Sequence, residues 1–368
     1  MALRPVLAVL VVLLVAAVGF AAKTRASADT RGFTRDLPCP NEVDILPCTC
    51  HTNVLGEMTM DCSLVKTSEE LERVFNATFP FKEFYELIIE HDPSNDNYQL
   101  TELKSDIFHR LTFERVIITG TKLEVIEESV FSYSYDTLKH LNLQDNKIND
   151  FPFESMTLYV NLEILVLDNN QLPTLEKFIS NSLKTLSMGY NANLAFTWDV
   201  FEKMPNLVNL NLESINLRDI PQHIFRNLTQ LVFLNFNNND LVELEENTFD
   251  SESRSLGILL LANNRIYKIM PNAIDGITAE AIIDMSNNRI ETLTRLIWQP
   301  IMDQMLGGIL DLTGNPLVCG CDMSWLFLDT SSVNPSQVYL PIITDHTTCY
   351  DGTQVKFLDY HVFQKHCT

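Results

Sequence analysis

Apolar and polar residues follow a fixed pattern through the middle of the chain. Four stretches share an eleven-place template, with apolar residues at places 1, 4, 6 and 11 and asparagine at place 9: LKHLNLQDNKI, LEILVLDNNQL, LVFLNFNNNDL and LGILLLANNRI. Places 4 and 6 are two residues apart, so in a strand both side chains fall on one face. Each stretch is therefore predicted to form a short strand whose apolar face covers a core.

The template recurs along most of the chain, about 25 residues apart. Its ten copies have these residues at place 9: Asp92, Thr121, Asn146, Asn170, Asn191, Ile215, Asn239, Asn264, Asn288 and Asn315. One copy cannot bury its apolar face alone, whereas stacked copies share a continuous core. We expect one solenoid over residues 84–317 and not two or three separate globular domains.

This template resembles the leucine-rich repeat, L-x-x-L-x-L-x-x-N-x-L. The resemblance implies an α/β solenoid, a leucine-rich repeat horseshoe with a parallel sheet on its concave side. It also implies that the asparagines form a buried ladder. A carboxamide has two donors and two acceptors, so each side chain can bond backbone groups of neighbouring turns. The alternative is that these asparagines are ordinary turn residues. Asp92, Thr121 and Ile215 should interrupt that ladder. Large apolar residues at place 19 are predicted to pack in the core on the convex side: Phe131, Phe201, Phe225, Phe249, Ile274 and Trp298.

The cysteines lie only at the two ends of the repeats. Four precede the repeats and four follow them: Cys39, Cys48, Cys50, Cys62, Cys319, Cys321, Cys349 and Cys367. A solenoid has two open ends where its core would meet water, so crosslinked caps are expected there. In a strand, Cys319 and Cys321 would point to opposite faces, so each must pair elsewhere. Each group of four allows three pairings, and the lack of C-x-x-C spacing argues against zinc.

Both cysteine groups resemble the flanking modules of extracellular leucine-rich repeat proteins. In NPLVCGCDMSW, Asn-Pro precedes the first late cysteine and Trp325 follows the second. The resemblance places Trp325 in the core of a cap. It implies the disulfides Cys39–Cys50, Cys48–Cys62, Cys319–Cys349 and Cys321–Cys367.

The start of the chain has the pattern of a secretory signal. Arg4 precedes an uncharged, largely apolar run over residues 5–22. This predicts a signal peptide over residues 1–22, cleaved between about Gly19 and Ala28, with an uncleaved signal anchor as the alternative. The expected order continues with a flexible segment over 23–38, a cysteine cap and linking helix over 39–83, the repeats over 84–317 and a C-terminal cap over 318–368. Passage through an oxidising compartment would suit four disulfides in a secreted, extracellular protein.

Charge and motif content exclude several functions. The 48 acidic residues against 26 lysines and arginines give a net charge of −22, which opposes binding to nucleic acid or anionic lipid. None of the common catalytic motifs is present, and His361 and His366 have the wrong spacing for a zinc helix. We expect no catalytic residue, no cofactor and no metal. The sequons NAT at Asn76 and NLT at Asn227 predict N-glycosylation.

A second, more specific resemblance lies just before the repeats. The stretch TSEELERVFNATFPF contains a capping box, Thr67 and Glu70, ahead of Leu71, Val74 and Phe75 at helical spacing. A short helix is predicted there. With the preceding cysteine segment, PCTCHTNVLGEMTMDCSLVK, it resembles crustacean secreted proteins related to the non-catalytic leucine-rich subunit of shrimp luciferase, Oplophorus-luciferin 2-monooxygenase.

Places 3, 5, 7 and 8 are predicted to face outward and form the concave surface, where such solenoids commonly bind partners. Place 3 turns apolar in the last four repeats and, with one place-5 residue, yields a candidate partner-binding cluster: Phe233, Ile258, Leu260, Ile282 and Ile309. Soluble monomers rarely expose such a patch, which favours an interface. Two alternatives would also explain these apolar residues: they pack against a cap, or they are present only because of their β-propensity. Polar candidates on the same face are Asn209, Asn211, Asn235 and Asn237.

Two functions remain open. The resemblance implies a secreted, non-enzymatic scaffold, an accessory subunit that stabilises a small catalytic luciferase-like chain in luminescence. The alternative is a soluble extracellular recognition protein acting in immunity, adhesion or matrix signalling. No later segment has the length to insert into a membrane after signal cleavage. An enzyme ranks third because the chain lacks a recognisable catalytic constellation.

Overall fold

The computed structural model describes residues 38–192, 194–328 and 338–367. The predicted signal peptide over residues 1–22, its cleavage region and nearly all of the predicted flexible segment lie outside the described residues. Within the described parts, no helix is long and apolar enough to cross a membrane.

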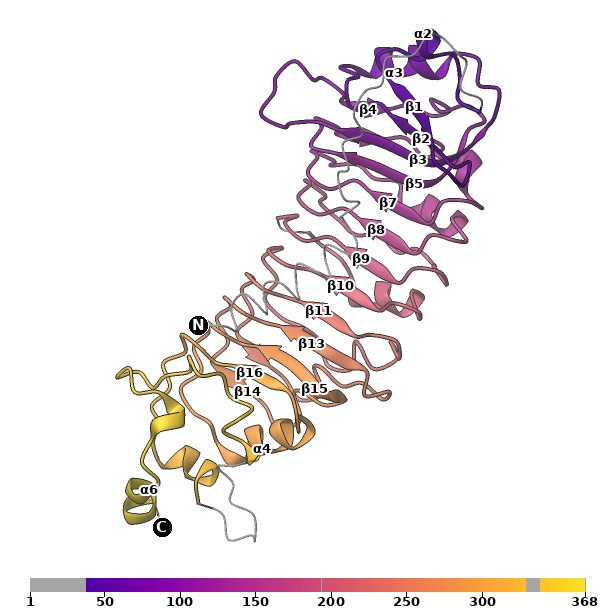
Figure 1. The fold of residues 1–368 in the computed structure, drawn as a ribbon. Helices are drawn as coiled ribbons and strands as arrows, with labels where there is room; N and C mark the ends of the chain where they lie inside the picture. Colours follow the sequence, from indigo (N-terminus) through magenta and orange to yellow (C-terminus); the bar gives the residue numbers. More distant parts are fainter. Residues whose placement is uncertain (1–37, 193, 329–337, 368) are drawn as a thin grey trace.

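One twelve-stranded sheet runs along the repeats, as Figure 1 shows. Its neighbours follow the chain order, so each repeat adds one strand beside the last, and all pairs are parallel except the first. The strands are β1 (Thr49–Thr52), β2 (Met58–Asp61), β3 (Glu83–Glu90), β5 (Thr112–Thr119), β7 (His140–Asn142), β8 (Ile164–Val166), β9 (Thr185–Ser187), β10 (Asn209–Asn211), β11 (Phe233–Asn235), β13 (Leu256–Leu260), β15 (Ile277–Asp284) and β16 (Ile309–Asp311). The predicted solenoid with a parallel sheet is confirmed.

Short elements fill the connections between these strands and the two caps. Two small parallel sheets pair β4 (Glu102–Leu103) with β6 (Val125–Ile126), and β12 (Glu243–Leu244) with β14 (Lys268–Ile269). The α-helices are α2 (Glu42–Ile45), α3 (Ser68–Phe75), α4 (Arg295–Gln304) and α6 (Tyr360–His366). The 3₁₀ turns are η1 (Ser132–Ser134), η2 (Phe153–Leu158), η3 (Trp198–Lys203), η4 (Cys321–Leu326) and η5 (Val355–Phe357).

The core is one continuous apolar cluster along the solenoid. The residues at places 4 and 6, such as Leu234 and Phe236, are fully buried beneath the sheet. All six large residues at place 19 are buried as well, and Phe225 stacks on Phe249 with ring centroids 5.9 Å apart. Each repeat therefore buries its apolar residues against the repeats before and after it.

Buried asparagine amides connect successive repeats. Asn239 is 5% exposed, and its amide nitrogen donates to the carbonyls of Leu212 and Phe236 at 2.8 and 3.0 Å. Its amide oxygen accepts from the Leu217 nitrogen at 2.9 Å. Equivalent bonds recur at other place-9 residues: Asn146, Asn170, Asn191, Asn264, Asn288 and Asn315. These amides satisfy backbone groups that the short strands leave inside the core.

The ladder is interrupted at only two of the three expected places. Ile215 has no amide to contribute, and the exposed Asp92 instead accepts from Ser94 in a local turn. At Thr121 the expectation is wrong, because its hydroxyl accepts from the Leu123 nitrogen at 3.1 Å and donates to Asn146 at 2.6 Å. A hydroxyl is both donor and acceptor, so it can replace part of the amide.

Place 8 does not belong to the concave sheet, contrary to the sequence pattern. Within the repeats, every strand of the twelve-stranded sheet ends at or before place 7. The residues at place 8 from the second repeat onward have positive φ: Gly120, Asp145, Asn169, Tyr190, Ser214, Asn238, Asn263, Asn287 and Gly314. Glycine, asparagine and aspartate adopt this left-handed conformation most readily, which explains their prevalence at this turn.

The amino-terminal end of the solenoid is closed by a disulfide-bonded cap. The structure pairs Cys39 with Cys50 and Cys48 with Cys62, as the family resemblance implies. The predicted linking helix is α3, where the Glu70 nitrogen donates to the Thr67 hydroxyl at 3.2 Å. Its buried residues continue the solenoid core into the cap.

The carboxy-terminal cap closes the other end. Cys319 pairs with Cys349 and Cys321 with Cys367, again the pairs that the resemblance implies. The two nearby cysteines do not lie in a strand, as was expected, because Cys319 has φ 56 and Cys321 begins η4. Trp325 is 5% exposed, and its indole nitrogen donates to the Leu293 carbonyl at 2.7 Å. It therefore ties the cap to the last repeats.

Replacing Asn239 by alanine should test the asparagine ladder. Several buried backbone groups would lose their partner, which we expect to lower the free energy of unfolding by about 3 kcal/mol. Asn206→Ala is the control, because Asn206 is exposed and makes one bond, to the Asn181 carbonyl. The control should cost less than about 1 kcal/mol in urea unfolding. Equal losses in the two variants would contradict the ladder.

Candidate protein-binding surface

The face of the sheet opposite the core carries the residues at places 3 and 5. Its amino-terminal part is charged: Arg115 Nε lies 3.0 Å from Glu86 Oε1 across β5 and β3. His140 on the next strand is 3% exposed, and neither ring nitrogen has a hydrogen-bond partner. Burial and the Arg115 charge lower the pKa of His140 to about 4. The imidazole is therefore neutral at physiological pH.

A carboxylate network lies in the middle of this surface, just past the strand ends. Asp168 Oδ1 accepts from the Gly189 nitrogen at 2.7 Å and from Asn211 Nδ2 at 3.0 Å. A Cβ at position 189 would lie 2.9 Å from the same oxygen. Glycine at 189 therefore allows the close approach of the carboxylate to the backbone.

Glu213 forms the second half of this network. Its carboxylate accepts from the Tyr190 hydroxyl at 2.7 Å, from Asn235 Nδ2 at 3.0 Å and from Asn238 Nδ2 at 2.6 Å. Burial raises the pKa of Asp168 to about 6, and the Glu213 charge adds to that rise, while hydrogen bonds partly oppose it. The two carboxylates make this part of the surface acidic.

The four polar candidates are engaged within the sheet. Asn209 donates to the Thr185 hydroxyl at 3.0 Å, and Asn237 accepts from the Ala262 nitrogen at 2.7 Å. Asn211 and Asn235 donate to the carboxylates described above. These amides order the surface, and only their remaining hydrogen-bonding capacity is open to a partner.

The five apolar candidates lie together on adjacent strands. In register, Phe233 stands opposite Ile258, Ile258 opposite Ile282, and Ile282 opposite Ile309, while Leu260 shares β13 with Ile258. Phe233, Ile258 and Leu260 form an apolar cluster separate from the main core, with Ile282 packed against it. We name these five residues the apolar row.

The apolar row is less exposed than the sequence pattern predicts. Phe233, Ile258 and Leu260 are only 5%, 8% and 2% exposed, because neighbouring strands bring their side chains against one another. Ile282 and Ile309 are half-buried. These two residues are the part of the row that a partner can reach directly.

Acidic side chains border the apolar row. Asp284 stands beside Leu260 in register, and Asp311 beside Asp284. Burial raises the pKa of Asp284, and the Asp311 charge adds to the rise. Asp168 and Glu213 lie just past the ends of β8 and β10, so all four acids lie beyond the place-3 residues of the row, toward the carboxyl ends of the strands. The sequence reasoning missed these acids, although they recur at places 5 and 7, which it had assigned to the outer face.

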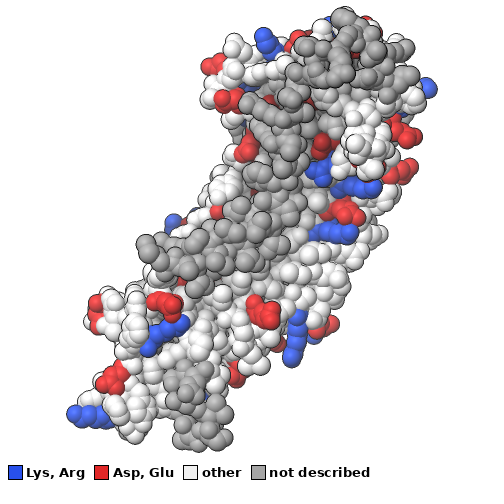
Figure 2. All heavy atoms as spheres, in the orientation of Figure 1, with Lys and Arg blue, Asp and Glu red and all other residues white. Residues whose placement is uncertain are grey.

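The remaining candidate residues lie apart from this surface. Asn76 ends helix α3 and Asn227 lies in the segment before β11; both are exposed. His361 and His366 are on α6. Within residues 38–192, 194–328 and 338–367, no three His, Cys, Asp or Glu side chains gather into a possible metal site. In the view of Figure 2, acidic and basic side chains are interspersed along the margins of the molecule.

Asp168 should make stability depend on pH. Its folded pKa of about 6 exceeds its ordinary value of 3.8, so the folded state holds more protons between these values. Stability contributed by this group therefore falls as pH rises from 4 to 6. We expect Asp168→Asn to be more stable than the wild type in urea at pH 7.5, with the difference vanishing near pH 4. A difference that grows toward acid would contradict the assignment.

Comparison with known proteins identifies the repeats. A family model for the BspA type leucine rich repeat region matches six copies over residues 82–170 and 195–294. In solved structures, a chain from the octameric complex of Latrophilin 3, Unc5D and FLRT2 superposes with TM-score 0.64 at 18% identity, covering 88% of this chain and 95% of that one. A chain from the Drosophila Toll–Spatzle complex superposes with TM-score 0.53 at 18% identity, over 75% and 41% of the two chains. These likenesses show the fold.

A curated relative covers nearly the whole chain. The Oplophorus-luciferin 2-monooxygenase non-catalytic subunit of Oplophorus gracilirostris is 31% identical over 332 residues, which cover 89% of this chain and 88% of the relative. Its name describes a non-catalytic subunit, in line with the prediction that this chain is not an enzyme. The chain belongs to the leucine-rich repeat family, together with the non-catalytic subunit of Oplophorus-luciferin 2-monooxygenase.

Proposed function

We propose that this protein is a secreted scaffold that binds another protein through the apolar row and its acidic border. The observation that carries the proposal is the row itself, five adjoining apolar residues on four adjacent strands. A β-sheet face that contacts only solvent is not expected to carry such a row of apolar residues. Leucine-rich repeat solenoids commonly bind their partners on this face.

The chemistry of the surface specifies the kind of partner. Ile282 and Ile309 offer accessible apolar contacts, and Ile282 packs on the same face against the cluster that contains the buried Ile258 and Phe233. Rigidly supported apolar groups make effective anchors because little side-chain entropy is lost on binding. The carboxylates toward the carboxyl ends of the strands suit a partner that presents lysine or arginine beside an apolar group.

The partner that we propose is a separate catalytic chain. The support is the relative named as a non-catalytic subunit of a luciferin monooxygenase, which is similar over 89% of this chain. In that arrangement the scaffold stabilises a smaller luciferase-like subunit and contributes no catalytic residue, cofactor or metal. Luminescence is then a property of the assembly, carried by the other subunit.

Secretion and glycosylation complete the proposal. Four disulfides with no free cysteine among the described residues suit an oxidising compartment. Asn76 and Asn227 are exposed, as glycan-bearing asparagines must be. Asn76 lies far from the apolar row in the repeat order, and Asn227 lies in the connection before β11 and not on a strand of the sheet, so we expect glycans at these sites to leave the row accessible.

Charge insertion into the apolar row should abolish partner binding. We expect Ile282→Glu to weaken binding of the catalytic chain roughly hundredfold, because a carboxylate would be buried against apolar groups. Ile164→Glu is the matched control: it has the same place in an earlier repeat and is also half-buried. Binding is measured by affinity capture from the native secretion. Mass spectrometry then identifies the recovered chains, and light emission with the luciferin reports their activity.

The outcome separates the two functions. Recovery of a small luminescent polypeptide by the wild type and the control, but not by Ile282→Glu, supports the proposal. If all three proteins recover it equally, the row is not the interface. If no such polypeptide is recovered and the protein instead binds extracellular ligands alone, the recognition function replaces the scaffold function.

The two sequons can be tested on the secreted protein. We expect glycopeptides at both Asn76 and Asn227, since both asparagines are exposed. Each single substitution, Asn76→Gln or Asn227→Gln, should remove one glycan and leave the other. Peptide mass spectrometry after glycosidase treatment in heavy-oxygen water reports occupancy at each site, and unmodified peptides at both sites would contradict the prediction.

A further inference from the structure

A pocket of about 400 Å³ opens at the amino-terminal end of the solenoid. It lies where α3 ends and where the chain enters β3 and β5, far along the sheet from the apolar row on β11 to β16. Its lining comes from the end of α3, from the loops before β3 and β5, and from Tyr133 on η1. Pockets of this size accommodate small organic ligands.

The wall of this pocket is aromatic and aliphatic. Phe75, Phe79 and Leu111 line it and are almost fully buried, while Tyr133 is 49% exposed at the margin. Phe75 and Phe79 stack with ring centroids 5.8 Å apart. Because these two rings already pack on each other and are almost fully buried, Tyr133 is the aromatic ring of the lining on which a flat ligand can stack.

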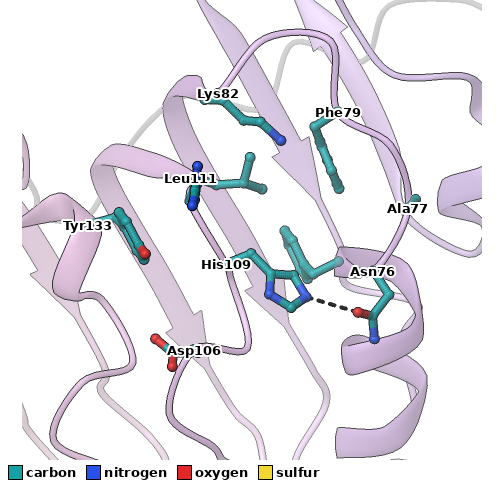
Figure 3. A pocket seen from close by; sticks show the side chains of 10 residues that line it. Asn76, Ala77, Phe79, Lys82, Asp106, His109, Leu111 and Tyr133 are labelled. Atoms are coloured by element: carbon teal, nitrogen blue, oxygen red, sulfur yellow. Dashed lines mark hydrogen bonds between the residues drawn. The ribbon is translucent and has the colours of Figure 1, made fainter.

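Cationic groups surround this apolar wall. Lys82 and Arg110 both line the pocket, and Lys82 Nζ lies 5.9 Å from the centre of the Phe79 ring. Figure 3 shows the Lys82 side chain extending from the loop before β3 toward Phe79. Neither cation forms an ion pair within the described parts of the chain, although the protein has 48 acidic residues. Asp106 is the only acid that lines the pocket.

The loop that carries Arg110 has an unusual conformation. Asp106 and His109 both have positive φ, 62 and 47, although neither is glycine. This conformation brings the His109 ring to Asn76, where His109 Nε2 lies 2.9 Å from Asn76 Oδ1, as Figure 3 shows. Since the amide oxygen only accepts, the imidazole is the donor.

We infer that this pocket binds a small anionic ligand with a flat apolar ring, such as an aryl carboxylate or aryl sulfate. The ring stacks on Tyr133 and packs against the edge of the apolar wall, and the anionic group lies between Lys82 and Arg110. Lys82 and Arg110 are exposed and line the same pocket, so one anionic group there can contact both. The inference is independent of the apolar row and of the partner proposed to bind there.

The sequon at Asn76 offers a second occupant for the same space. Asn76 lines the pocket, so a glycan attached to it would begin at the rim. A neutral sugar would not make use of two cations, which is why we favour the free anionic ligand. The experiment must nevertheless be done on the secreted protein and on its Asn76→Gln variant.

Calorimetric titration with naphthalene-2-sulfonate tests the inference, with uncharged naphthalene-2-sulfonamide as the matched probe. We expect the sulfonate to bind at least about tenfold more tightly than the sulfonamide, because of its charge-assisted contacts. Lys82→Gln combined with Arg110→Gln should remove this preference. Lys104→Gln combined with Lys122→Gln removes the same net charge outside the pocket and should leave the preference intact. Circular dichroism and thermal unfolding establish that each variant is folded.

Three results would overturn the inference: no binding of the sulfonate, equal affinities for the two probes, or equal effects of the two double variants. Binding that appears only in Asn76→Gln would also overturn it, and would assign the pocket to the protein's own glycan. The inference is supported if the wild type and the control double variant both prefer the sulfonate over the sulfonamide and if only the change of Lys82 and Arg110 removes this preference.

Discussion

The structure depends on the burial of backbone groups between short parallel strands. Most strands of the repeats contain only three residues, so the sheet alone cannot satisfy the polar backbone that turns into the core at each repeat. The place-9 amides supply the missing bonds, as at Asn239, where one side chain serves the repeat before it and its own. An apolar core can then continue through every repeat without unpaired polar groups. The caps extend the same core to both ends and close it there.

The division of the strand into two faces allows one fold to carry different surfaces. Places 4 and 6 are constrained by the core, whereas places 3 and 5 face away from it and are free to vary. Along the same sheet the outer face changes from the Glu86–Arg115 ion pair, through the Asp168 and Glu213 network, to the apolar row. The pocket near Asn76 uses neither face, because it is built from the loops that lead into the strands.

The regular features of this fold could be predicted from the sequence, and the exceptions show why the rest could not. The period and the apolar places indicate the parallel sheet and its core, and the capping box at Thr67 indicates helix α3. The exposure of Phe233 was beyond prediction because it depends on how Ile258 and Leu260 pack across the sheet. The hydroxyl of Thr121 replaces an amide through a geometry that no spacing reveals. The pocket joins residues from 75 to 133, and only the fold brings them together.

Ile215 supplies no amide to the repeat before it, but side chains of the outer face bond across that joint: Tyr190 to Glu213, Asn209 to Thr185 and Asn211 to Asp168. In a linear array each repeat is held only by its neighbours, so thermal opening starts at the least bonded joint or at a free end. Disulfides fasten both ends here, which prevents fraying from the tips. The joint at Ile215 separates a charged half from the half that carries the apolar row. The polar network of the outer face therefore also has a mechanical role, because it holds the two halves of the array together where the asparagine ladder is missing.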